Sequence, residues 1–355
     1  MNRIGAWQLA FVYAGCFLGA GYVSGQEILQ FFGAFGVWGM VGICISSLLQ
    51  GCFCIILLSL IRRRGHYDVE RVMVRRERLR WRALLGGAQL LLLFGVTVIM
   101  AAGVGALIDQ MFTRGGRWAS LLFCAAVALA ALLGVKGMVA VFSAAVPLLS
   151  LAVLLLSALA FGRFGIRVPM PSPHTTPLLP HWTVAAVLFV SYNMFGSVAV
   201  LVPVGRQIAN RRTARRGVVI GTLFLLVAAL LILLALATLP ETVSAELPML
   251  ALAQRLHPAL GRGFAALLLF AMFGTALSCT VAAREYLTLK LPRVSRRPWA
   301  AILPYTALAY AGGLLGFGDL IGWIYPIFGY LGCFVLLSVI AHERHVRREE
   351  SGHGI

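Results

Sequence analysis

The chain has 355 residues, of which 60% are hydrophobic and only 12% are charged, and its formal net charge is +18. This composition excludes a soluble globular domain and indicates a helical membrane protein with several spans. In a soluble protein so much positive charge would suggest nucleic acid, but here the basic residues lie between hydrophobic segments, which argues against a nucleic-acid partner.

Ten hydrophobic segments, each long enough to cross a bilayer, follow one another along the chain. No cleavable signal peptide is apparent, so we expect the first segment to remain in the mature protein. A turn at 134–137 separates the fourth segment from the fifth. The predicted spans are 7–32, 35–61, 83–109, 117–134, 138–161, 181–205, 217–239, 263–289, 298–316 and 320–340.

The distribution of lysine and arginine sets the orientation of these spans. With a cytoplasmic amino terminus, the inside segments carry 24 basic residues and the outside segments carry 6 of the 30. Basic residues concentrate on the cytoplasmic side of membrane proteins. The bias therefore predicts ten spans in a bacterial cytoplasmic membrane, with both termini in the cytoplasm.

The first span is interrupted by polar residues and glycines. Its part from Gly15 to Phe32 has the sequence GCFLGAGYVSGQEILQFF, with glycines at 19 and 21. The spacing Ser24-x-x-Glu27 is that of a capping box, which predicts a helix start inside the bilayer. Backbone groups freed there survive only beside protein or a water-filled cavity, so we predict a cavity. The alternative is that Gly15 and Gly19 form a packing face for another helix.

Glu27 has two interpretations that the sequence leaves open. A carboxylate inside a membrane span is costly unless it is paired, solvated or protonated, so Glu27 is a candidate proton carrier. Together with Ser24, it is also a candidate helix cap near the positive end of a half-helix.

The sixth span carries a second polar stretch, Ser191 to Ser197, with the sequence SYNMFGS. Interrupted spans at corresponding positions of two halves indicate inverted repeats with a binding site between them. The alternative is that Tyr192 and Asn193 hydrogen-bond a neighbouring helix. We predict a first repeat at 1–162, an external crossing at 163–180, a second repeat at 181–341 and a cytoplasmic tail at 342–355.

At these two places the sequence resembles the LeuT-fold transporters, which include the amino acid, polyamine and organocation superfamily. More narrowly, FVYAGCFLGAGYVSGQEILQFF resembles a bacterial branch, the YkvI-like membrane proteins. The resemblance implies an all-α membrane fold of ten helices, a 5+5 inverted repeat with broken helices 1 and 6. It implies that substrate binds at the unwound parts of both. The matching positions are Gly19, Ala20, Gly21, Tyr192, Asn193, Phe195 and Gly196.

The resemblance also implies a cation site between the first and eighth spans, as in many sodium-coupled members. Thr275 and Ser278 share one face of the eighth span, and backbone carbonyls near Gly15 and Leu18 would complete an oxygen cage. Cys279 departs from the family pattern, because a thiol is a poor ligand for a hard cation. The alternative is that these hydroxyls bond their own helix carbonyls.

We therefore predict a secondary active transporter of a small solute, an amino acid or related metabolite, working by cation-coupled alternating access. The expected partners are the lipid bilayer and the small-molecule substrate. No cofactor is expected beyond Na⁺ or H⁺ as the coupling ion, and no other metal. The alternative function is a receptor or sensor subunit of the same fold, resembling spore germination receptors, without net transport. An enzyme is not predicted, because clustered acids, bases or metal ligands are absent from the spans apart from Glu27.

Overall fold

The computed structural model describes residues 4–64, 72, 79–133, 138–171, 176–205, 207–208, 210–291 and 297–352, and its regular elements there are all helices. The turn expected at 134–137 and most of the basic segment between Arg62 and Arg82 lie outside these residues. The helices are α1 (Ala6–Gly15), α2 (Ala20–Val23), α3 (Gln26–Phe32), η1 (Gly33–Phe35), α4 (Val37–Arg64), α6 (Leu79–Phe112), α7 (Gly116–Leu133), α8 (Met138–Phe164), α9 (Trp182–Gly205), α10 (Arg211–Thr238), η2 (Pro240–Ser244), α11 (Pro248–Leu256), α12 (Pro258–Lys290), α14 (Trp299–Gly312) and α15 (Phe317–Gly352).

Six helices of the described residues are long and apolar enough to cross a membrane by themselves: segments of α4, α6, α8, α10, α12 and α15. Two shorter apolar helices lie at Gly116–Leu132 and Trp182–Val198. The chain is thus a multi-pass helical membrane protein. The count of ten spans in two inverted repeats stays a prediction.

The seven tryptophans mark the ends of the helices. Six of them lie within the first three residues of α1, α4, α6, α7, α9 and α14, and Trp323 is the seventh residue of α15. All but Trp182 are exposed. Trp38 and Trp182, at the starts of α4 and α9, stack at 5.7 Å. Tryptophan is enriched at the two membrane–water interfaces, so this placement fits helices that begin at the membrane surface.

Contacts between connecting segments join parts of the chain that the charge bias assigns to the same side. On the expected cytoplasmic side, the Ile4 N–H donates to the Gln207 carbonyl at 2.9 Å. On the expected outer side, Arg163 Nη1 donates to the Leu256 carbonyl at 2.7 Å, and Gln110 Nε2 to that of Leu247 at 3.3 Å. These contacts agree with the assignment of each pair of segments to one side of the membrane. Which side is cytoplasmic remains a prediction.

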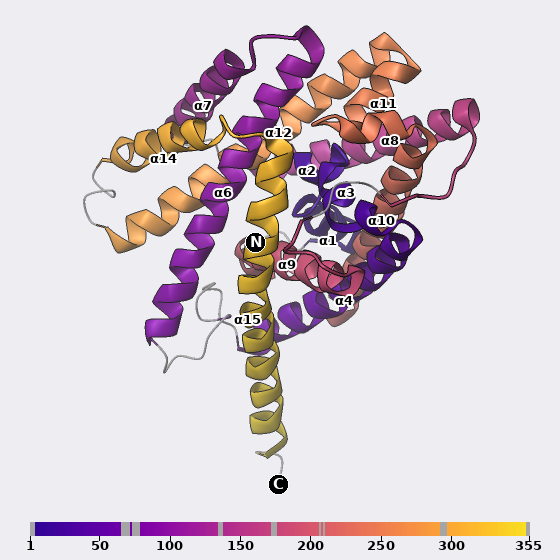
Figure 1. Cartoon of the computed structure of the whole chain (residues 1–355). Coiled ribbons are helices and arrows are strands. Elements are labelled where there is room, and N and C mark those ends of the chain that lie inside the picture. Colours follow the sequence, from indigo (N-terminus) through magenta and orange to yellow (C-terminus); the bar gives the residue numbers. More distant parts are fainter. Residues whose placement is uncertain are drawn as a thin grey trace.

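The short helices α2 and α3 lie near the middle of the molecule (Figure 1). The α2 helix contacts α12, and α3 contacts α9 and α15. Helix α15 runs past the rest of the body toward the carboxyl terminus. It continues to Gly352 without a break near 341, so the boundary predicted there falls inside a helix.

Gly25 shapes the junction between α2 and α3. Its φ of +83° is in the left-handed region, which suits glycine. A Cβ at this position would lie 2.9 Å from Leu236 and 3.1 Å from Met249. The helix therefore turns at Gly25 because this glycine has both the backbone freedom and the small volume that the junction requires.

The predicted capping box at this junction is wrong. Gly25, not Ser24, is the residue that precedes α3, and it makes no side-chain cap. The Ser24 hydroxyl instead donates to the Gly21 carbonyl at 3.0 Å and accepts from the Gln26 N–H at 3.4 Å. Glu27 does not reach back to the Ser24 backbone. Its side chain has a different partner, described below.

The predicted interruption of the sixth span is also wrong. Helix α9 is continuous from Trp182 to Gly205. The polar side chains that suggested a break bond within the helix: Ser191 to the Val187 carbonyl, Asn193 to that of Phe189 and Ser197 to that of Met194. Because these side chains satisfy themselves on their own helix, they do not require an unwound backbone.

The external segment after α10 contains the short helix α11. One face of this helix is buried. Met249, Leu250 and Leu252 are fully buried, and the Met249 N–H donates to the Ser24 carbonyl at 2.8 Å. Helix α11 thus supplies a partner for a backbone group that the α2–α3 junction releases.

Candidate functional site

The backbone between α1 and α2 leaves several polar groups without partners. Within the described residues, no backbone N–H donates to the carbonyls of Gly15, Cys16 or Leu18. The N–H groups of Ala20 and Gly21 likewise donate to no backbone carbonyl there. Each buried group left unpaired costs about 1–3 kcal/mol. Such a segment is stable only where water, an ion or a solute meets it.

Glu27 lies in the first turn of α3 and is only 4% exposed. Its carboxylate accepts a hydrogen bond from the Tyr192 hydroxyl of α9, 165 residues away in sequence. No lysine, arginine or histidine in the described ranges forms an ion pair with it. Burying a carboxylate without a cation is costly, so a proton or a positively charged ligand would stabilise this position.

Aromatic rings surround the Glu27–Tyr192 pair. We call Tyr22, Phe31, Phe32, Phe189, Tyr192 and Tyr325 the aromatic cluster. Tyr192 lies between two stacked neighbours, Tyr325 at 4.6 Å and Phe31 at 5.4 Å. Phe189, one turn earlier on α9, meets Phe31 and Phe32 edge to face. The cluster joins α2, α3, α9 and α15 around one buried carboxylate.

Gly21 faces this cluster from α2. A Cβ there would lie 3.1 Å from Glu27 Oε2, 3.5 Å from Ile321 and 3.7 Å from Tyr325. The glycine therefore lets the backbone of the interrupted segment approach the carboxylate. Its neighbour Tyr22 is fixed by a 2.7 Å hydrogen bond from its hydroxyl to the Leu225 carbonyl of α10.

The structure brings some of the predicted substrate-binding residues together and separates others. Gly21 and Tyr192 both meet Glu27, and Gly19 and Ala20 form the unpartnered backbone beside them. The Asn193 side chain donates to the Phe189 carbonyl of its own helix and also hydrogen-bonds Glu27. Phe195 is fully buried in the hydrophobic core, and a Cβ on Gly196 would meet Leu92 of α6.

The predicted cation ligands come from two parts of the chain. Thr275 and Ser278 lie on α12, which contacts α2, whereas Gly15 ends α1 and Leu18 lies between α1 and α2. The Ser278 hydroxyl donates to the Gly274 carbonyl at 2.7 Å, as the alternative interpretation expects. That bond uses the proton and leaves oxygen lone pairs free for a cation. The carbonyls of Gly15 and Leu18 lack donors within the described residues. The chemistry of this oxygen set fits a hard cation such as sodium.

The site also contains four residues that the sequence patterns do not predict: Phe31, Phe189, Ile321 and Tyr325. Phe31 and Phe189 resemble ordinary core residues in the sequence. Tyr325 carried a usable signal, because Pro326 follows it inside a hydrophobic span and α15 continues through that proline. A proline removes a helical hydrogen bond, and a tyrosine beside it is a candidate to line a site.

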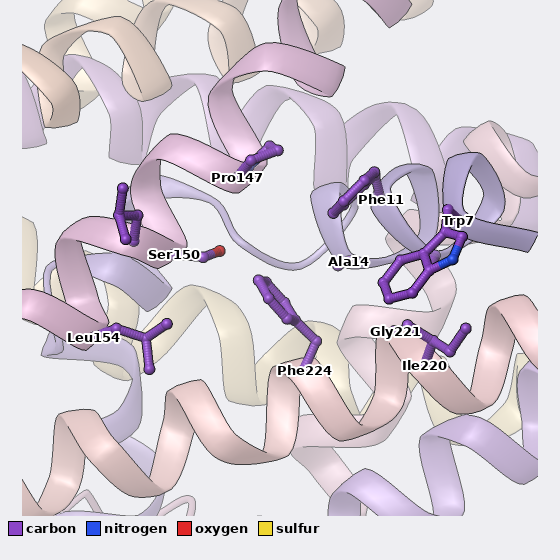
Figure 2. A pocket seen from close by; sticks show the side chains of 11 residues that line it. Trp7, Phe11, Ala14, Pro147, Ser150, Leu154, Ile220, Gly221 and Phe224 are labelled. Carbon is purple, nitrogen blue, oxygen red and sulfur yellow. The ribbon is translucent and has the colours of Figure 1, made fainter.

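An apolar cavity of about 270 Å³ lies between α1, α8 and α10. Figure 2 shows the rings of Trp7, Phe11 and Phe224 around it, with Pro147 at one side. Its Ser150 hydroxyl already donates to the Val146 carbonyl at 2.6 Å. This cavity suits hydrocarbon better than a charged solute, and the polar site lies at Glu27 instead.

The chain was compared with protein families, with curated proteins and with solved structures. No protein-family model matches the chain. It is 27% identical over 352 residues to "Uncharacterized membrane protein YkvI" of Bacillus subtilis (strain 168), covering 97% of each chain.

Two solved transporters share the architecture. MhsT in complex with L-phenylalanine superposes with a TM-score of 0.68 at 14% identity, covering 97% of this chain and 93% of MhsT. Mhp1 in its inward-facing conformation gives a TM-score of 0.67 at 14% identity, covering 93% of this chain and 74% of Mhp1. Both have the LeuT fold, and the likeness shows that this chain has that fold as well.

Proposed function

We propose that this protein is a secondary active transporter that moves a small solute, an amino acid or related metabolite, by cation-coupled alternating access. The observation that carries the proposal is Glu27, a buried carboxylate with no cation partner in the described residues, beside the unpartnered backbone of the interrupted first segment. In transporters with discontinuous helices, such breaks near the midplane form the substrate site.

The geometry favours a solute that carries an ammonium group and an apolar part. The Glu27 carboxylate would neutralise the ammonium, and the aromatic cluster offers ring faces to an apolar side chain. The N–H groups of Ala20 and Gly21, which donate to no backbone carbonyl within the described residues, would donate to a carboxylate. MhsT was solved with L-phenylalanine, an amphoteric aromatic molecule of this kind, which supports an amino acid as the first candidate.

Two coupling ions are consistent with the residues present. Sodium would take the carbonyl oxygens of Gly15 and Leu18 with the hydroxyls of Thr275 and Ser278. A proton would neutralise Glu27 during part of the cycle. We propose that α1–α3 and α9 move against the remaining helices, with the repeats at 1–162 and 181–341 as the two halves. We place the protein in a bacterial cytoplasmic membrane with both termini inside.

A thermal-shift screen of the purified protein tests the proposal. Amino acids and small carboxylates would be screened with sodium, with potassium and across pH, followed by uptake into proteoliposomes. We expect one chemical group of compounds to stabilise the protein and to be taken up against its gradient when the coupling ion gradient is present. Saturable binding without flux would instead favour the receptor function.

Substitution of Gly21 tests whether the ligand binds at the proposed site. In Gly21→Leu, the new side chain would occupy the space of Glu27 Oε2 and Tyr325, so we expect stabilisation by the ligand to disappear while membrane insertion is retained. Gly263→Leu on α12 is the matched control, because no atom lies within 4 Å of a Cβ there. Normal binding by the Gly21 variant would contradict the proposed site.

A further inference from the structure

A groove of about 470 Å³ lies along the carboxyl-terminal part of α15. Among the described residues, three apolar side chains and then two basic ones line it: Leu337, Ile340, Ala341, Arg344 and His345. They recur with the spacing i, i+3, i+4, i+7 and i+8, which places them on one face of the helix. We call this feature the α15 groove. Solute transport through the site at Glu27 does not assign it a role.

The α15 groove lies at the depth of one membrane–water interface. The apolar span of α15 covers Phe317–Val346, and Trp323 near its start is exposed. Tryptophan is enriched at such interfaces, and Arg344 follows Trp323 by 21 residues. At 1.5 Å per residue, this part of the helix rises about 32 Å, which matches the hydrocarbon thickness of about 30 Å. With Trp323 at one interface, Arg344 therefore lies among the headgroups of the other, on the predicted cytoplasmic side.

The opposite face of this helix end is packed against the protein. Glu343 and Val346 are buried, and His342 Nδ1 lies 3.2 Å from the carbonyl oxygen of Val72. Leu337 on the groove face is by contrast 65% exposed. The packed face holds the helix end in one orientation, so the groove faces away from the protein, toward the surrounding lipid.

The basic end of the groove suits a phosphate group. Arg344 is exposed, and no carboxylate of the described residues forms an ion pair with it. Its guanidinium presents N–H donors in a planar fork, which binds two phosphate oxygens at once. The next residue, His345, adds the ring nitrogens of an imidazole to the same end of the groove.

The order of residues along the groove matches the order of groups in a phospholipid. Leu337, Ile340 and Ala341 precede Arg344 by one to two helical turns, on the membrane side of it. An acyl chain would cover these apolar residues while the phosphate meets Arg344. A free phosphate ion would leave the apolar part of the groove uncovered. The groove is therefore suited to a lipid and not to a soluble anion.

We propose that the α15 groove binds an anionic phospholipid, with the phosphate on Arg344 and His345 and one acyl chain along Leu337, Ile340 and Ala341. No carboxylate is among the lining residues in the described ranges, so a headgroup with net negative charge meets no repulsion there. A zwitterionic headgroup would bring its own ammonium group close to the guanidinium, and like charges repel. The groove therefore selects an anionic lipid over a zwitterionic one.

The α15 groove is separate from the proposed substrate site at Glu27. Tyr325 is the α15 residue of the aromatic cluster, and it precedes Leu337 by 12 residues. That spacing corresponds to about 18 Å along the helix. The proposal goes beyond transport, because a lipid can occupy this groove without any solute flux.

The test is a thermal-shift titration of the full-length protein in detergent with dioctanoyl phosphatidylglycerol, a short-chain anionic phospholipid. Dioctanoyl phosphatidylcholine, glycerol phosphate and inorganic phosphate are titrated separately at constant ionic strength. We expect saturable stabilisation by phosphatidylglycerol, at a midpoint concentration well below those of the other three compounds.

Substitutions at both ends of the groove should weaken the lipid. In Arg344→Gln the midpoint concentration should rise about fivefold or more, because one arginine near an anionic membrane surface contributes about that factor. Arg344→Lys keeps the charge but loses the planar fork, so its midpoint should lie between those of the wild type and Arg344→Gln. Leu337→Ala shortens the apolar wall and should raise the midpoint severalfold. Both residues are exposed, so the unfolding midpoint without lipid should stay that of the wild type.

Two controls make the result specific. Arg212→Gln removes an exposed arginine near the start of α10, on the same predicted side but outside the groove, and should leave the lipid midpoint unchanged. Leu308→Ala truncates a leucine of α14 that is exposed like Leu337, and should also leave it unchanged. A wild-type midpoint in Arg344→Gln would overturn the proposal, as would equal weakening in Arg212→Gln. Stabilisation by glycerol phosphate or phosphatidylcholine at the same concentration as phosphatidylglycerol would overturn it as well.

Discussion

At the scale of single residues, Glu27 is the side chain on which the proposed binding site depends. It lies in the first turn of α3, where the helix dipole favours negative charge, and its carboxylate accepts from Tyr192. Neither interaction supplies a full positive charge. A proton carrier and a receptor for a solute's ammonium group are therefore chemically related roles for the same side chain.

Glu27→Gln and Tyr192→Phe separate these roles. Glutamine cannot carry a proton, so if Glu27 couples transport to protons, uptake in Glu27→Gln should lose its dependence on pH. Tyr192→Phe keeps the carboxylate but removes its donor. Hydrogen bonds to charged groups contribute about 1.5–3 kcal/mol, so we expect ligand affinity about 10- to 100-fold weaker. Uptake by Glu27→Gln with the wild-type pH profile would leave Glu27 a structural residue.

Ser278 tests sodium coupling. Ser278→Ala removes one oxygen ligand from the proposed cation site, and we expect the sodium concentration for half-maximal ligand binding to rise about tenfold. Thr280→Val is the matched control, since the Thr280 hydroxyl also bonds its own helix, at the Ala276 carbonyl, but lies outside the proposed cage. If sodium dependence is the same in both variants, the cation site lies elsewhere.

At the scale of elements, the junction of α2 and α3 is held by packing from outside the first segment. The Met249 N–H of α11 donates to the Ser24 carbonyl, and the Leu236 side chain of α10 packs against Gly25. The external segment before α12 therefore stabilises the bend, which places Glu27 beside α9.

Gly25→Ala tests this junction. A non-glycine residue in the left-handed region costs about 1–2 kcal/mol, and overpacking against Leu236 and Met249 adds about 1–3 kcal/mol. We expect a clear fall in the thermal unfolding midpoint. Gly87→Ala is the control, because a Cβ there meets no atom within 4 Å, and its midpoint should stay at or above that of the wild type. Equal midpoints for the two variants would contradict a strained junction.

The continuity of α9 shows how a polar stretch can mislead. Serine and asparagine inside an apolar helix predict a break only if their side chains compete for the backbone. In α9 they donate to carbonyls of their own helix and leave it intact. Any unwinding of this helix during transport would be a change from the conformation described here.

At the scale of the whole molecule, the arginine bias and the contacts between loops are consistent with one topology. We expect a fluorescent protein fused to the carboxyl end of α15 to fold and fluoresce in the cytoplasm, and one fused in the segment after Phe112 to stay dark. A periplasmic alkaline phosphatase reporter at the same two positions should give the opposite pattern. Fluorescence at both positions would contradict the predicted orientation.

The sequence by itself determined the class of the protein and the interruption of its first segment. Long apolar segments predict membrane helices, and basic loops predict sidedness, because both follow from local solvation of the chain. The glycines and polar residues between Gly15 and Glu27 likewise mark the interrupted segment, because a helix cannot bury such a run in lipid without partners.

Only the tertiary structure decided which partners these groups take. It pairs Glu27 with Tyr192 across 165 residues, not with Ser24, and it adds Tyr325 from α15. In the structure the Ser24 carbonyl accepts a hydrogen bond from α11, and α9 is a continuous helix. A buried polar group bonds whichever partner the packing of distant helices brings within reach, and local spacing does not encode that choice.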